Sequence, residues 1–222
     1  MAKSRKATLL FILPFAAWMG LMFVLPPTAL SYAIRSAATL CAGIACMLLW
    51  RRGCTSTEEG TAHGKRIVPM WIQFAIGVIV GATVCALWIW LPTWPFPEPV
   101  APDPSPYAPS VCGWPLTIAK LVGSAFIIAP VEEVFFRSFL YRWLIARDFL
   151  SVPLSRFDLS AFLWMILLFT LEHDRPVAAA MTGAFYGLLA IRAGLGSAIA
   201  AHVTTNLLLG LHVIHHNAWQ FW

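Results

Sequence analysis

Three ionisable side chains lie close together in a very apolar part of the sequence. Glu132 and Glu133 are adjacent, and Arg137 follows four residues after Glu133. An ionisable side chain near the centre of a membrane-spanning helix costs about 2.5–3.5 kcal/mol, so such a residue points to a function. A spacing of four places Glu133 and Arg137 on one helix face, where they can form an ion pair. Glu132 points about 100° away from Glu133 and stays free for chemistry.

Two further apolar segments carry polar side chains that could join this group. Phe169 and His173 are four residues apart at the end of one segment, and His202 and Asn206 share a face of another. A carboxylate and a neutral imidazole can take a proton from a shared water and make that water nucleophilic. A second imidazole and a carboxamide can donate N–H groups to a developing oxyanion. These side-chain types therefore predict hydrolysis by an activated water.

Each of these groups also has a structural interpretation. Glu133 and Arg137 could form a buried salt bridge without a catalytic role. His202 and Asn206 could hold helices together by hydrogen bonds across the bundle. The segment Glu172–Pro176, which holds one of the histidines, has the composition of an interfacial turn. All three alternatives stay open at the level of the sequence.

Other functions remain possible for the same set of side chains. Zinc could be bound by four of them, namely Glu132, Glu133, His173 and His202. Arg137 beside the two carboxylates opposes a bound dication, so we expect no metal or other cofactor. A non-catalytic membrane partner, such as an immunity or scaffold protein, could keep the same fold without the reaction. A chelator and a Glu132→Gln variant separate these alternatives.

The composition sets the fold class. The 222 residues are 59% hydrophobic and 11% charged, which is too apolar for one soluble core. A helix needs about 20 apolar residues to cross a membrane. The sequence predicts an all-α, multi-pass bundle of about seven spans, of which the fifth and sixth are short. The spans are Ala7–Leu25, Leu30–Trp50, Ile67–Leu91, Leu116–Phe136 with a helical extension, Leu159–Leu171, Val177–Ile191 and Leu195–Ile214.

We expect a single integral membrane domain over residues 1–222, with the motif-bearing core in residues 116–216. Glu132 must lie at the same depth as His173, so the fourth helix should be long and hold Glu132 near its middle. The mixed segment Ser138–Asp158 suits an amphipathic helix on the inner membrane surface.

The charge pattern indicates a topology. The net charge is +5, and the basic residues gather at the ends of apolar segments, so we expect a lipid bilayer as partner and no nucleic acid. The positive-inside rule places the N-terminus in the cytoplasm and the C-terminus outside the cell inner (plasma) membrane. Trp219, Phe221 and Trp222 would then be interfacial anchors.

Three motifs together carry a family resemblance. EExxxR at Glu132–Arg137, FxxxH at Phe169–His173 and HxxxN at His202–Asn206 follow one another on successive apolar segments. In this order they resemble the CPBP (Abi) family of intramembrane proteases, which includes the CAAX-processing endoprotease Rce1. The short layout and the aromatic C-terminal tail are similar to the CAAX protease-related proteins that accompany exosortases in bacteria. The resemblance covers about the last hundred residues.

The resemblance implies a glutamate-type endopeptidase that acts on a membrane-associated or lipid-anchored polypeptide. It also suggests an exosortase-type sorting system as a partner. Carried onto the matching positions, it implies these roles: Glu132 as general base, His173 as its partner on the water, His202 and Asn206 as oxyanion hole, and Glu133, Arg137 and Phe169 as supporting residues.

Overall fold

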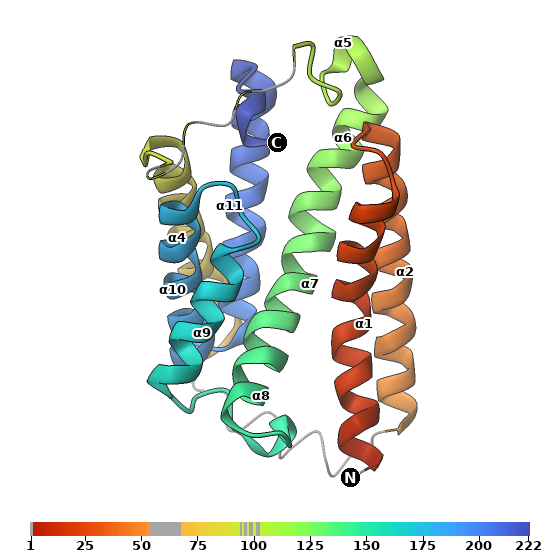
Figure 1. Cartoon of the computed structure of the whole chain (residues 1–222). Coiled ribbons are helices and arrows are strands. Elements are labelled where there is room, and N and C mark those ends of the chain that lie inside the picture. Colours follow the sequence, from red (N-terminus) through yellow and green to blue (C-terminus); the bar gives the residue numbers. More distant parts are fainter. Residues whose placement is uncertain (1, 54–67, 94, 96, 98–99, 101–102) are drawn as a thin grey trace.

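The described part of the chain is helical and contains no strand (Figure 1). The computed structural model describes residues 2–53, 68–93, 95, 97, 100 and 103–222. Within these ranges, five helices are long and apolar enough to cross a membrane. They are α1 (Ala2–Val24), α2 (Ala29–Gly53), α4 (Met70–Trp90), the continuous helix Trp114–Ile145 and α11 (Leu195–His216). The predicted all-α membrane bundle is confirmed.

Two shorter apolar helices complete the bundle, namely α9 (Leu159–Thr170) and α10 (Pro176–Arg192). At 1.5 Å per residue, α9 is about 18 Å long, which is less than the roughly 30 Å of a hydrocarbon core. The predicted spans otherwise agree with the helices within a few residues; residue 67, where the third was expected to begin, lies outside the described ranges. Single short turns are α5 (Pro109–Cys112), η3 (Phe149–Ser151) and η4 (Trp219–Phe221).

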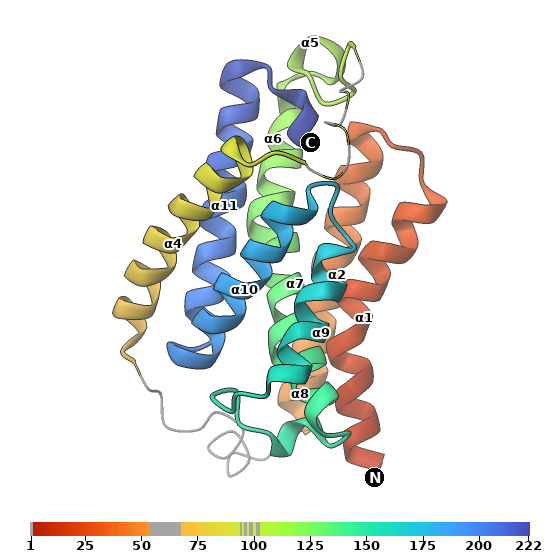
Figure 2. The same cartoon turned by 60° about the vertical axis from the view of Figure 1, so that its left-hand side comes forward.

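The helices form two groups on either side of the long helix. α1 and α2 make an antiparallel pair on one side, and α4, α10 and α11 lie on the other (Figure 1). α9 packs against α10 and against the lower part of the long helix (Figure 2). The N-terminus and the C-terminus lie at opposite ends of this bundle. The long helix is therefore the central element that both groups contact.

The long helix changes its winding twice. It runs through α6 (Trp114–Val122), a wide π-helical segment η1 (Gly123–Ile128), α7 (Ala129–Glu133), a second π-helical segment η2 (Val134–Leu140) and α8 (Tyr141–Ile145). Pro130 cannot donate a backbone hydrogen bond and its ring crowds the preceding turn, which a wider winding accommodates. Glu132 and Glu133 lie between the two wide segments, near the middle of the helix. This placement confirms the expectation of a long helix.

The connection from α8 to α9 corrects one prediction. We expected one amphipathic helix over Ser138–Asp158, but the long helix includes the first part of this range and ends at Ile145. Ala146 is extended, with φ −150° and ψ 142°, and the rest of the range forms turns. The polar and apolar mixture that suggested a surface helix belongs instead to the end of a span and to a folded loop.

Hydrogen bonds fix where α9 begins. The Tyr141 hydroxyl donates to the Arg156 carbonyl at 2.7 Å and accepts from the Asp158 backbone N–H at 2.9 Å. Asp158 caps α9, since its Oδ1 accepts from the Ala161 backbone N–H at 2.9 Å. The end of the long helix and the start of α9 are thereby joined.

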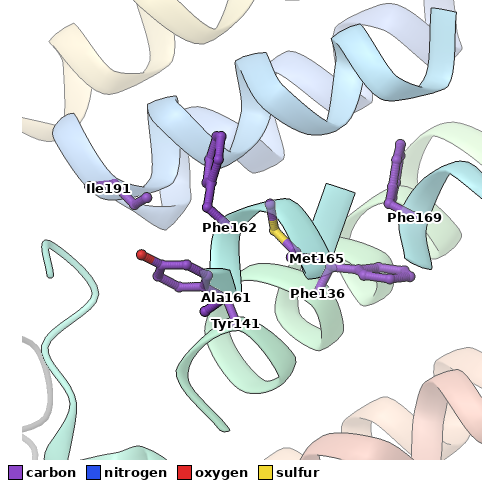
Figure 3. Close-up of a cluster of buried hydrophobic side chains, with 7 residues drawn as sticks. All are labelled: Phe136, Tyr141, Ala161, Phe162, Met165, Phe169 and Ile191. Atoms are coloured by element: carbon purple, nitrogen blue, oxygen red, sulfur yellow. The ribbon is translucent and has the colours of Figure 1, made fainter. Parts of the chain in front are cut away.

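An apolar core holds α9 between the long helix and α10 (Figure 3). Its buried residues are Phe136, Tyr141, Ala161, Phe162, Met165, Phe169 and Ile191. The rings of Phe136 and Phe169 meet edge to face, with centroids 5.3 Å apart. Phe169 thus stands at one end of the core, beside the ionisable residues.

Within the group of α4, α10 and α11, glycines allow α4 to approach α11 closely. A Cβ atom at Gly77 would lie 2.6 Å from the Ala200 Cβ, and one at Gly81 would overlap the Ala201 carbonyl oxygen. No side chain fits at either position without moving a helix. This contact fixes α11, which carries His202 and Asn206.

Candidate active site

Glu133 is the centre of the buried polar group. Its side chain is fully buried, and its Oε1 atom lies 3.1 Å from Arg137 Nη1 and 2.8 Å from His202 Nδ1. The ion pair expected from the spacing of four is confirmed, and α11 adds a histidine to it. A carboxylate can only accept here, so His202 Nδ1 carries the proton. Glu133 therefore holds two cationic or donor groups in fixed positions.

His202 lies between the two glutamates. Its Nε2 atom is 3.7 Å from Glu132 Oε2, while its Nδ1 atom faces Glu133. The Glu132 side chain is 13% exposed, whereas that of Glu133 is not exposed at all. Glu132 is therefore the carboxylate that a small molecule can reach.

A chain of hydroxyl groups supports His202 from behind. The Tyr186 ring lies 5.2 Å from the His202 ring, and the Tyr186 hydroxyl donates to Thr205 Oγ1 at 2.6 Å. Thr205 in turn donates to the Gly81 carbonyl at 2.7 Å. α4, α10 and α11 are thus joined directly behind the imidazole.

His173 has a defined tautomer. Its Nδ1 atom lies 2.7 Å from the Phe169 carbonyl oxygen, which can only accept, so Nδ1 carries the proton. In the neutral ring Nε2 is then a free acceptor. The His173 ring packs between Phe169, at 4.5 Å, and Trp88, at 5.6 Å.

Phe169 connects the histidines with the arginine. Its ring lies 4.5 Å from the His173 ring and 6.2 Å from the His202 ring, and Arg137 Cζ stands 4.4 Å from its centre. A cation over an aromatic face is stabilised by about 0.5–2 kcal/mol. His173 joins the group through this aromatic ring.

Asn206 lies on the same face of α11 as His202 and bonds to the long helix. Its Nδ2 atom donates to the Ser124 carbonyl in η1 at 3.1 Å. This is the interhelical hydrogen bond that the packing interpretation expected. The amide has a second N–H, which this bond does not use.

The match to known proteins falls on this part of the chain. Residues 114–208 match a protein-family model described as "Type II CAAX prenyl endopeptidase Rce1-like". This match supports the CAAX protease family for the core of the chain. No curated protein and no solved structure gives a match. All three motifs lie within the matched residues, and the resemblance seen in the sequence is confirmed at the level of the family.

The CAAX protease family contains peptide hydrolases, so this chain is a peptide hydrolase with several apolar membrane helices. The match is to the wider Rce1-like group. The exosortase-associated subfamily and an exosortase-type partner therefore stay predictions.

One carboxylate of this CAAX-type protease was missed in the sequence. Glu172 has an Oε2 atom that is buried without a hydrogen-bond partner, and its charge acts on Glu132 and Arg137. Its position directly before His173 was a usable signal. Tyr186 and Trp88 were missed too, and a single aromatic residue in an apolar helix gives no such signal.

The zinc alternative depends on convergent donor atoms. Among the described residues, no group of three or more His, Cys, Asp or Glu side chains is arranged to hold a metal ion. Arg137 occupies the space beside Glu133 that a dication would share. Acid–base chemistry without a metal stays a prediction for these residues, and a chelator tests it.

Proposed function

We propose that this CAAX-type protease hydrolyses a peptide bond of a membrane-associated or lipid-anchored polypeptide with a water activated by Glu132 and His173. The observation that carries the proposal is the position of His202, whose two ring nitrogens face Glu132 and Glu133 at 3.7 and 2.8 Å. A partly exposed carboxylate, a fully buried carboxylate and an imidazole then form one acid–base unit inside the family core.

Glu132 and His173 would bind the water through its two protons. The His173 tautomer leaves Nε2 as an acceptor, and the Glu132 carboxylate is a second acceptor. Glu132 takes one proton as the water oxygen attacks the carbonyl carbon. The same proton then passes to the departing amine, and Glu132 returns to the carboxylate form.

His202 and Asn206 would stabilise the oxyanion. In its protonated form His202 donates from Nε2, and the Glu133 carboxylate stabilises that imidazolium through Nδ1. The unused N–H of Asn206 is the second donor. Arg137 is the ion-pair partner of Glu133 on the long helix and lies beside this imidazole.

For the membrane orientation we propose a cytoplasmic N-terminus and an external C-terminus in the cell inner (plasma) membrane. The ends of α2 and α8, which carry Arg51, Arg52 and Arg142, lie at the same end of the bundle as the N-terminus (Figure 1). Basic residues favour the cytoplasmic side.

The test is cleavage of membrane-proteome peptides by the native protein in proteoliposomes. We compare it with His173→Ala and with Asp148→Asn, a control at an exposed carboxylate in the loop after α8. We expect His173→Ala to lose cleavage, Asp148→Asn to keep it, and a chelator to have no effect. Cleavage that stops with the chelator and returns with zinc would establish a metalloprotease, and no cleavage by the native protein would favour a non-catalytic partner.

A further inference from the structure

A second group of charged side chains lies on the long helix and α2, towards the end of the bundle that holds the C-terminus. Lys120 Nζ stands 3.8 Å from the centre of the Tyr32 ring and 4.9 Å from that of Tyr107. Arg35 Cζ stands 4.3 Å from the centre of the Trp18 ring and 5.3 Å from that of Tyr32. The two cations share the Tyr32 ring.

The C-terminus adds a further aromatic wall. The chain turns back after α11 and brings η4 beside α6 (Figure 2). Trp222 then lies with its ring 5.7 Å from Lys120 Nζ and 6.2 Å from the Tyr107 ring. We call the six residues the basic aromatic cluster: Trp18, Tyr32, Arg35, Tyr107, Lys120 and Trp222.

The positive charge of the cluster is not neutralised within the described residues. None of the ion pairs in the described chain includes Arg35 or Lys120, and the two cations repel each other. Arg35 Nε is buried without a hydrogen-bond partner. Aromatic faces stabilise cations but carry no net negative charge. Both cations are half-buried, so an anion can reach them.

The cluster adjoins the candidate active site. Gly123 brings η1 so close to α2 that a Cβ atom there would lie 3.0 Å from Tyr32 Cε1. The next residue, Ser124, accepts the hydrogen bond from Asn206. Tyr32 and Trp18 are buried between helices rather than turned to the lipid. The η1 segment therefore links the cluster to the candidate active site.

The long helix gives the distance between the basic aromatic cluster and Glu132. Lys120 precedes Glu132 by twelve residues on one continuous helix, which corresponds to about 18 Å at 1.5 Å per residue. An extended peptide advances about 3.3 Å per residue, so about five residues cover this distance.

We propose that the basic aromatic cluster binds a carboxylate of the polypeptide substrate that lies about four to six residues from the bond that is cut. This proposal rests on the proposed function and adds the chemical class of the substrate. The carboxylate is either an Asp or Glu side chain or the end of the chain. The surrounding rings exclude water and strengthen its attraction to Arg35 and Lys120.

The experiment uses peptides that the native protein cleaves in the proteoliposome assay. Each is made with a free or an amidated C-terminus, and with its acidic residues intact or changed to Gln or Asn. We expect the carboxylate form to have a kcat/KM roughly ten-fold higher. The double variant Arg35→Gln and Lys120→Gln should abolish this ratio and leave cleavage of the neutral peptide unchanged. If amidation removes the preference, the carboxylate is the end of the chain. If replacement of the acidic residues removes it, the carboxylate is an Asp or Glu side chain.

The matched control is Arg147→Gln, because Arg147 also stands over a ring, 3.9 Å from the centre of Trp143, but at the opposite end of the bundle. It should keep the ratio. The peptide pairs are also bound to Glu132→Gln protein, so the preference is measured even if cleavage fails. An unchanged preference in the double variant overturns the proposal. If the double variant instead keeps the peptide preference and changes only the difference in cleavage between anionic and zwitterionic vesicles, that result identifies a lipid site and also overturns the proposal.

Discussion

At the scale of single residues, Glu133 is the shared partner of two groups. Its Oε1 atom faces Arg137 on its own helix and His202 on α11, and neither Glu133 nor Arg137 is exposed. Breaking a buried ion pair by removing one partner leaves the other charge without compensation. The arginine and the glutamate therefore depend on each other for stability.

A Glu133→Gln variant should lower the free energy of unfolding by about 3–5 kcal/mol, because Arg137 remains buried and charged. The double variant Glu133→Gln and Arg137→Met should recover much of this stability. It should still lack activity, since His202 has lost its carboxylate. Unfolding in detergent and peptide cleavage measure the two effects, and a single variant as stable as the native protein would contradict the buried ion pair.

The sequence predicted part of this arrangement and missed part. The spacing of four between Glu133 and Arg137 was enough to predict the ion pair, because both residues lie on one helix. His202 Nδ1 meets Glu133 through packing of α11 on the long helix, which no local pattern contains. The Phe169 carbonyl that fixes the tautomer of His173 is backbone and has no signature in the sequence.

At the scale of the elements, the contact of α4 with α11 positions His202. Gly81 lies against the Ala201 backbone, and its own carbonyl accepts from Thr205. The apolar runs predicted where these helices lie. They did not predict the π-helical segments beside Glu132, because side-chain periodicity is not sensitive to a single widened turn.

A Gly81→Ala variant should force α4 away from α11 and cost about 1–3 kcal/mol. Cleavage should fall with it, because Thr205 and Tyr186 behind His202 move as well. Gly43→Ala in α2 is the matched control, since a Cβ atom there meets nothing within 4 Å. Equal stability and activity of the two variants in detergent would show that the close approach is unimportant.

At the scale of the whole molecule, the two ends of the chain lie at opposite ends of the bundle (Figure 1). Composition was sufficient for the all-α membrane class, since 59% hydrophobic residues exclude a soluble core of this size. The number of membrane crossings was harder to predict from the sequence. α9 has only 12 residues, and neighbouring helices must cover its sides.

A reporter joined to the C-terminus tests the proposed orientation. Alkaline phosphatase placed after Trp222 should be active, and green fluorescent protein at the same position should stay dark, because the proposed orientation places the C-terminus outside. The same reporters joined after Arg52, at the basic end of α2, should give the opposite result. Fluorescence at the C-terminal position would reverse the orientation.

The central claim is that Glu132 takes the proton from the attacking water. The most direct test is the single-turnover rate of Glu132→Gln on a peptide that the native protein cleaves, with the affinity for that peptide measured in parallel. We predict a rate lower by about 10²–10⁴-fold with nearly unchanged affinity, because a removed general base affects the chemical step. A rate close to that of the native protein would show that Glu132 is not the base.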